Sequence, residues 1–137
     1  MRIWGLLLCL LLAGCRSGLV FKEAPQTVLD SRQTTKLVGE IQPWGLYFTA
    51  LSHYDGEQTR LLVLSEIGIK LLDMGISAQQ TEVYFKAEAL PKVAAAAFGR
   101  FAKTHLQTAC PEQQISFTDS RTRARFSVQA TGEEKCL

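Results

Sequence analysis

Between residues 36 and 89 the chain carries a series of short apolar segments separated by turn signals, and this series limits the fold more than any other feature. The segments are rich in leucine, β-branched and aromatic residues, which is typical of β-strands. Asp55-Gly56, Gly68 and the segment 77–80 separate them, and glycine accepts the positive φ of tight hairpins. Because consecutive strands with short links usually pair, the series predicts an antiparallel meander.

One helix is predicted after the meander. Pro91 suits its first turn, where the missing N–H has no partner to lose, and Pro111 marks its end. Lys92, Arg100 and Lys103 lie largely off its apolar stripe. That stripe recurs at helical spacing and holds Val93, Ala94, Ala97, Phe98, Phe101 and Leu106.

Two further strands are predicted in the segments 114–120 and 121–132, with a turn near Asp119. The expected fold class is therefore α+β: a curved antiparallel sheet, a half-barrel-like meander, with one main helix packed on it.

Both faces of the middle strands are apolar. Leu61 and Val63 point to one face of their strand, and Leu62 and Leu64 point to the other. A meander packed on a single helix needs only one apolar face, so the second face requires a cover. The sheet could curl on itself, a partner subunit could pack there, or the face could line a cavity for an apolar ligand.

The N-terminus has the pattern of an export signal. Arg2 precedes the apolar run 3–14, which is shorter than the roughly 20 residues that a membrane-spanning helix needs and fits a secretory signal. The run ends in Leu-Ala-Gly-Cys, which resembles the lipobox of bacterial lipoproteins. The resemblance implies cleavage before Cys15 and acylation of Cys15. Arg16 is not the Asp that favours retention in the inner membrane, so we expect an outer-membrane lipoprotein anchored by lipid on the periplasmic face.

These features predict a lipoprotein signal peptide over residues 1–14, a lipidated N-terminus and tether over 15–34, and one sheet-plus-helix domain over 35–137. The formal net charge of +2 gives no strong field that would favour a nucleic-acid partner. Arg121, Arg123 and Arg125 alternate, so in a strand they would share one face. That face would be solvated or would contact anionic lipid headgroups.

Four cysteines have to be placed. Cys9 leaves with the signal peptide and Cys15 carries lipid, so Cys110 and Cys136 remain. In an oxidising compartment such a pair favours a disulfide, which would tie the C-terminal tail to the end of the helix.

The sequence predicts neither catalysis nor a bound metal or cofactor. His53 and His105 are the only histidines, and neither stands at the spacing of a metal site. The acidic residues are dispersed, and neither a serine nucleophile elbow nor a glycine-rich phosphate loop occurs. We therefore expect a protein that is not an enzyme.

The segment RLLVLSEIGIKLLDMGIS (60–77) resembles the paired strands of the lipoprotein-carrier superfamily, the LolA/LolB-like group, through Leu62, Leu64, Gly68 and Leu71. The segment 89–106 resembles the helix that follows them. The resemblance implies an open half-barrel whose concave apolar face receives acyl chains. The candidate lining residues are Trp44, Leu46, Phe48, Leu62, Leu64, Ile69, Leu71, Val83 and Phe85, with Phe98 and Phe101 of the helix as a mobile lid.

Two functions are thus expected. The first is an outer-membrane lipoprotein that binds or transfers a lipid or a lipoprotein acyl chain in an apolar cavity of the curved sheet. The alternative is a structural or assembly lipoprotein of an envelope complex that uses the second apolar sheet face as an interface. The partners would be the membrane, through the anchor, and a lipid or envelope proteins.

Overall fold

The computed structural model describes residues 19–25 and 34–131. The predicted α+β fold, a curved sheet with one main helix packed on it, is confirmed. The meander, the helix and the terminal hairpin follow one another in the predicted order. The elements are β1 (Val20–Phe21), β2 (Thr35–Gln42), β3 (Leu46–Tyr54), β4 (Thr59–Ser65), β5 (Lys70–Ile76), β6 (Thr81–Lys86), α2 (Lys92–His105), β7 (Gln114–Thr118) and β8 (Arg125–Thr131).

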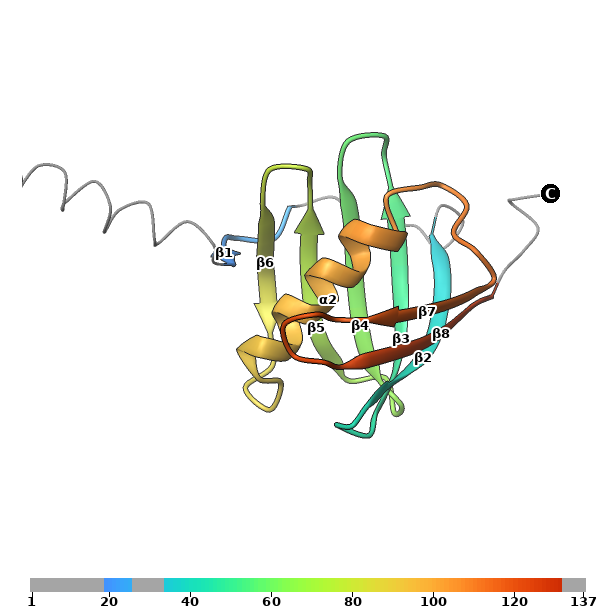
Figure 1. Cartoon of the computed structure of the whole chain (residues 1–137). Coiled ribbons are helices and arrows are strands. Elements are labelled where there is room, and N and C mark those ends of the chain that lie inside the picture. Colours follow the sequence, from blue (N-terminus) through green and yellow to red (C-terminus); the bar gives the residue numbers. More distant parts are fainter. Residues whose placement is uncertain (1–18, 26–33, 132–137) are drawn as a thin grey trace, which may run out of the picture.

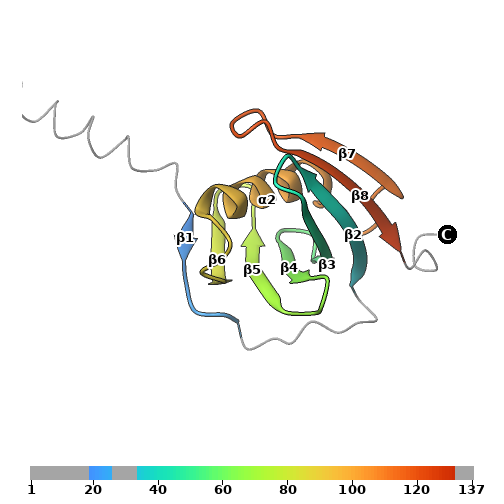
Figure 2. The ribbon, with the colours of Figure 1, turned by 90° about the horizontal axis from the view of Figure 1, so that it is seen from below.

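The strands form one eight-stranded sheet in the order β1-β6-β5-β4-β3-β2-β8-β7. All neighbours are antiparallel except β1 and β6, which run parallel, so the sheet is mixed rather than purely antiparallel. The β7–β8 hairpin joins the sheet beside β2 and extends it past the meander. The sheet curls around α2 but stays open, with β1 and β7 at its edges (Figures 1 and 2).

The face of the sheet that packs against α2, here called the helix face, holds the core. Register aligns Ala50 with Val63, and directly opposed residues point to the same face. The ring of Phe98 packs edge-on against Phe48 at 5.0 Å and against Phe126 at 5.3 Å between centroids. The helix therefore fills the concave side of the sheet with its own side chains.

Close packing extends to the backbone in the middle of β2. A Cβ at Gly39 would lie 2.8 Å from Cζ of Phe48, 2.9 Å from Cγ2 of Val128 and 3.0 Å from the backbone oxygen of Ser127. These separations are below normal van der Waals contact. Glycine at this position thus lets β2 pass beneath core side chains from β3 and β8.

The opposite face of the sheet, here called the outer face, is mixed in character. Leu62 and Leu64 lie on it and are half-buried. Asp73, opposite Leu62 in the register, is 2% exposed and accepts two hydrogen bonds of 2.8 Å from the guanidinium of Arg60. The second face is therefore less uniformly apolar than the alternation in sequence suggests.

Candidate functional site: a groove between α2 and the β1–β6 edge

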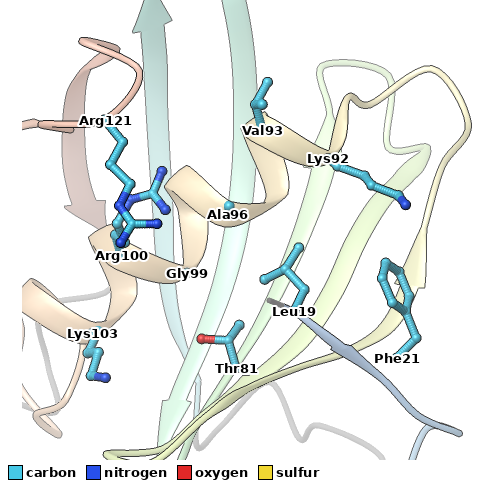
Figure 3. Close-up of a pocket in the computed structure, with 10 residues that line it drawn as sticks. All are labelled: Leu19, Phe21, Thr81, Lys92, Val93, Ala96, Gly99, Arg100, Lys103 and Arg121. Carbon is cyan, nitrogen blue, oxygen red and sulfur yellow. The ribbon is translucent and has the colours of Figure 1, made fainter. Parts of the chain in front are cut away.

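An open groove of about 570 Å³ lies between α2 and the sheet edge formed by β1 and β6. Figure 3 shows the side chains that line it, which come from four segments of the chain. Apolar and cationic groups share the lining, and no acidic residue belongs to it. The lining residues are Leu19, Phe21, Thr81, Lys92, Val93, Ala96, Gly99, Arg100, Lys103 and Arg121.

One face of α2 supplies the wall of the groove. Lys92, Ala96, Gly99 and Lys103 follow a spacing of four, three and four residues, which places them on one side of a helix. The small residues stand in the middle of that series. A Cβ at Gly99 would lie 3.1 Å from Cγ2 of Thr81, so glycine allows α2 to approach β6 closely at this point.

The opposite wall is β1. Val20 pairs with Glu82, and Phe21 with Val83, and the backbone N–H of Lys22 donates to the oxygen of Val83 at 3.0 Å. Strand alternation turns Leu19 and Phe21 to the same side, where both line the groove.

An ion pair secures β1 as well. Lys22 Nζ lies 2.9 Å from Oε1 of Glu82. The hydrogen bond from Lys22 is the main reason that the pKa of Glu82 lies below its ordinary value. The pair attaches β1 to β6 next to the groove.

A third segment reaches the groove from the β7–β8 turn. Asp119 in this turn is 1% exposed and accepts two hydrogen bonds from Arg100 of α2, at 2.6 and 2.8 Å. It also accepts hydrogen bonds from the backbone N–H and hydroxyl of Thr122. These contacts fix the turn against the helix and thereby position Arg121, two residues away, at the groove.

The same contacts set the electrostatics. The hydrogen bond from Arg100 is the main reason that the pKa of Asp119 lies well below its ordinary value, and the same bond raises the pKa of Arg100. Arg100 is thus balanced by a buried carboxylate. Within residues 19–25 and 34–131, no carboxylate pairs with Lys92, Lys103 or Arg121. The groove therefore carries three uncompensated positive charges around an apolar centre.

The residues predicted to line a cavity do not meet around this groove. Four of them, Phe48, Val83, Phe98 and Phe101, are buried in the core between the helix face and α2. Leu46 and Leu71 pack on that core. Leu62 and Leu64 lie on the outer face, half-buried. The remaining three are exposed: Trp44 (40%), Ile69 (56%) and Phe85 (41%).

The three alternating arginines are not on one strand face. Arg121 and Arg123 belong to the turn before β8, and Arg123 has a φ of 60°, whereas Arg125 is the first residue of β8. The prediction of a shared face fails because the strand begins four residues later than expected. Only Arg121 of the three lines the groove.

Several predicted features lie outside the described residues. Cys15, the predicted lipidation site, is one, and Cys136, the predicted partner of Cys110, is another. In the described part of the chain, no helix has the length and apolar character to cross a bilayer. Among the same residues, no three His, Cys, Asp or Glu side chains gather as metal ligands would.

The groove was missed in the sequence because its lining comes from segments about a hundred residues apart. One signal was present: three cations of the helix stand off the apolar stripe at positions 92, 100 and 103. Comparison with known proteins adds no homologue, since no protein family, curated protein or solved structure matches this chain.

Proposed function

We propose that this chain is a lipid-anchored lipoprotein of the bacterial outer membrane that binds the acyl chain of a lipid in the groove between α2 and the β1–β6 edge. The observation that carries the proposal is the apolar wall of this open groove. Phe21 is 54% exposed and Val93 is 55% exposed, and both line it together with Leu19. Its volume of about 570 Å³ falls in the range of small-ligand sites, roughly 300–1,000 Å³.

The site differs from the concavity that the sequence resemblance implies. Phe98 and Phe101 occupy the concave side of the sheet and are 0% and 1% exposed, so α2 takes the place of a ligand there. The other side of the same helix borders the groove. An acyl chain would therefore lie outside the curved sheet, against α2 and β1.

Binding needs no covalent step. Each methylene group transferred from water to an apolar surface contributes about 0.8 kcal/mol, and an open groove that covers only part of a chain keeps the ligand exchangeable. Transfer between two such proteins, or between protein and membrane, would follow their difference in affinity.

The predicted anchor supports this location. Cys15 precedes Leu19 by four residues, and four extended residues span at most about 14 Å. Acylation of Cys15 would therefore hold the groove close to the bilayer surface, where lipids are the most abundant apolar ligands.

Photocrosslinking of the full chain tests the proposal. Val93 is replaced by p-benzoylphenylalanine, and the protein is reconstituted into phosphatidylcholine vesicles with deuterated acyl chains. The matched control carries the same photoreactive residue at Val38, an exposed valine on β2 (43% exposed, against 55% for Val93). We expect deuterated adducts from position 93 and none from position 38.

A second pair of variants checks that the apolar wall is responsible. Phe21→Ser should lower the yield of lipid adducts from position 93. Phe85→Ser should not, because Phe85 is an exposed phenylalanine on β6 outside the groove. Equal adducts at both positions, or adducts only to the acyl chains of the protein's own anchor, would contradict the proposal.

A structural or assembly lipoprotein is the second candidate. It is favoured by the exposed apolar side chains near the β4–β5 turn, Ile67 (81%) and Ile69 (56%), and by Phe85 on the outer face. This function predicts a stable complex after gentle membrane extraction that Ile69→Asp disrupts. Unchanged complexes in that variant would remove the reason to prefer the outer face as an interface.

A further inference from the structure

We propose that the groove selects lipids with an anionic, phosphate-bearing headgroup over zwitterionic lipids. The inference rests on the proposed acyl-chain function and adds the chemical class of the ligand. It follows from the distribution of charge along α2 and the β7–β8 turn.

Positive charge stands at both ends of the apolar wall. Lys92 lies at the start of α2, beside Phe21, and Lys103 lies eleven residues later, about 17 Å along the helix axis. Arg121 extends from the turn toward the Lys103 end, where Arg100 also lies (Figure 3). An amphiphile with its chain against Leu19 would thus meet the denser group of cations at one end.

The stability of the helix does not explain the charge at its start. Lys92 stands in the first turn of α2, which contains no acidic residue, although the helix dipole disfavours a cation at that end. Lys103, by contrast, lies in the last turn of α2, where the dipole favours a cation. A bound anion would offset the repulsion at Lys92.

The contrast between Arg100 and the other three cations of the groove also favours an anionic ligand. Arg100 has a buried carboxylate partner in Asp119 and serves the fold. Lys92, Lys103 and Arg121 are exposed and have no acidic partner among residues 19–25 and 34–131. Three exposed cations beside an apolar wall are complementary to a phosphate group that carries acyl chains.

A competition experiment tests the selection. The full chain with p-benzoylphenylalanine at position 93 is placed in vesicles with equal amounts of phosphatidylglycerol and phosphatidylcholine, and the ratio of their adducts is measured by mass spectrometry. The variant Lys103→Gln/Arg121→Gln removes one lysine and one arginine of the groove. The matched control Lys36→Gln/Arg125→Gln removes the same pair of residue types from exposed positions on β2 and β8.

We expect the unsubstituted groove to favour phosphatidylglycerol. Because one basic residue near an anionic lipid surface contributes roughly a fivefold preference, the groove variant, which lacks two, should lower the adduct ratio about twenty-five-fold. The control variant should keep the ratio. Added salt should reduce the preference, since exposed charges are screened, and excess inorganic phosphate should leave adduct formation intact.

The outcomes separate this inference from the function on which it rests. Adducts to both lipids in equal yield would overturn the headgroup selection and leave acyl-chain binding intact. A loss of preference that is the same in the groove and control variants would also overturn it, because general surface charge would then be the cause. Absence of adducts from position 93 would overturn both proposals, and loss of adducts in inorganic phosphate would identify a site for small anions instead.

Discussion

Asp119 is the residue whose side chain connects the terminal hairpin to the helix. It is almost fully buried and is paired with a guanidinium on α2 while it also accepts hydrogen bonds from its own turn. A buried charge is favourable only when it is paired and hydrogen-bonded. The position of Arg121 at the groove therefore depends on a carboxylate that is not part of the groove lining.

Replacement of this carboxylate should destabilise the fold. Asp119→Asn removes the charge that pairs with Arg100 and leaves a half-buried guanidinium without its partner. We expect a loss of about 1–3 kcal/mol in the free energy of unfolding, measured by urea denaturation. Glu112→Gln, at an exposed acidic position, serves as the control and should change little. Equal stability of both variants would show that the pair is not structural.

The same residue predicts a pH dependence. The folded-state pKa of Asp119 is lower than its ordinary value of 3.8, so between these two values the unfolded chain binds the proton more tightly. Stability from this group is fully present above about pH 5 and is lost as the pH falls through the folded-state value. Unfolding measured from neutral to acidic pH should show a steeper acid loss in the unsubstituted protein than in Asp119→Asn. If stability falls equally steeply with pH in both proteins, Asp119 is not the source of the acid loss.

At the scale of elements, Gly39 decides how closely β2, β3 and β8 pack beneath α2. The added methyl group of Gly39→Ala would meet a ring carbon, a core valine and a backbone oxygen at 2.8–3.0 Å, so a local shift is required. Overpacking of this kind costs about 1–3 kcal/mol. Thermal denaturation should show a lower Tm for Gly39→Ala, whereas Ser127→Ala, at an exposed position on β8, should stay near the unsubstituted value.

The order and type of the elements could be predicted from the sequence because strands and helices have different apolar periods. Register could not. The candidate cavity combined Phe48 with Leu62 as if they shared a face, but the register opposes Leu62 to Leu51, so it points away from Phe48 and the core. Alternation within one strand does not tell which of its faces joins which face of the next strand.

The parallel pairing of β1 was also beyond the sequence. A short edge strand in the segment 16–33 fits the residue types there, but its neighbour β6 lies some sixty residues further along the chain. Pairing at this distance depends on the position of the whole meander. The groove depends on it in turn, since Leu19 and Phe21 reach α2 only through this pairing.

At the scale of the whole molecule, the pair of Cys110 and Cys136 gives a further prediction. A disulfide between them would close a loop of roughly 25 residues and contribute about 3 kcal/mol by the chain-entropy estimate. Cys136→Ser should lower the free energy of unfolding by this amount. A reductant should lower the free energy of unfolding of the unsubstituted protein by the same amount. It should leave that of the variant unchanged. Detection of both thiols as free in the denatured, unreduced protein would exclude the bond.

The mechanical behaviour of the fold follows from how unevenly its strands are joined. β1 meets β6 through two residue pairs, whereas β2 meets β3 through seven. A pull on the chain ahead of Leu19 therefore loads the weakest junction first, and β1 peels away while the seven other strands and α2 hold together. Tension at the N-terminus would thus remove one wall of the groove without unfolding the rest of the protein.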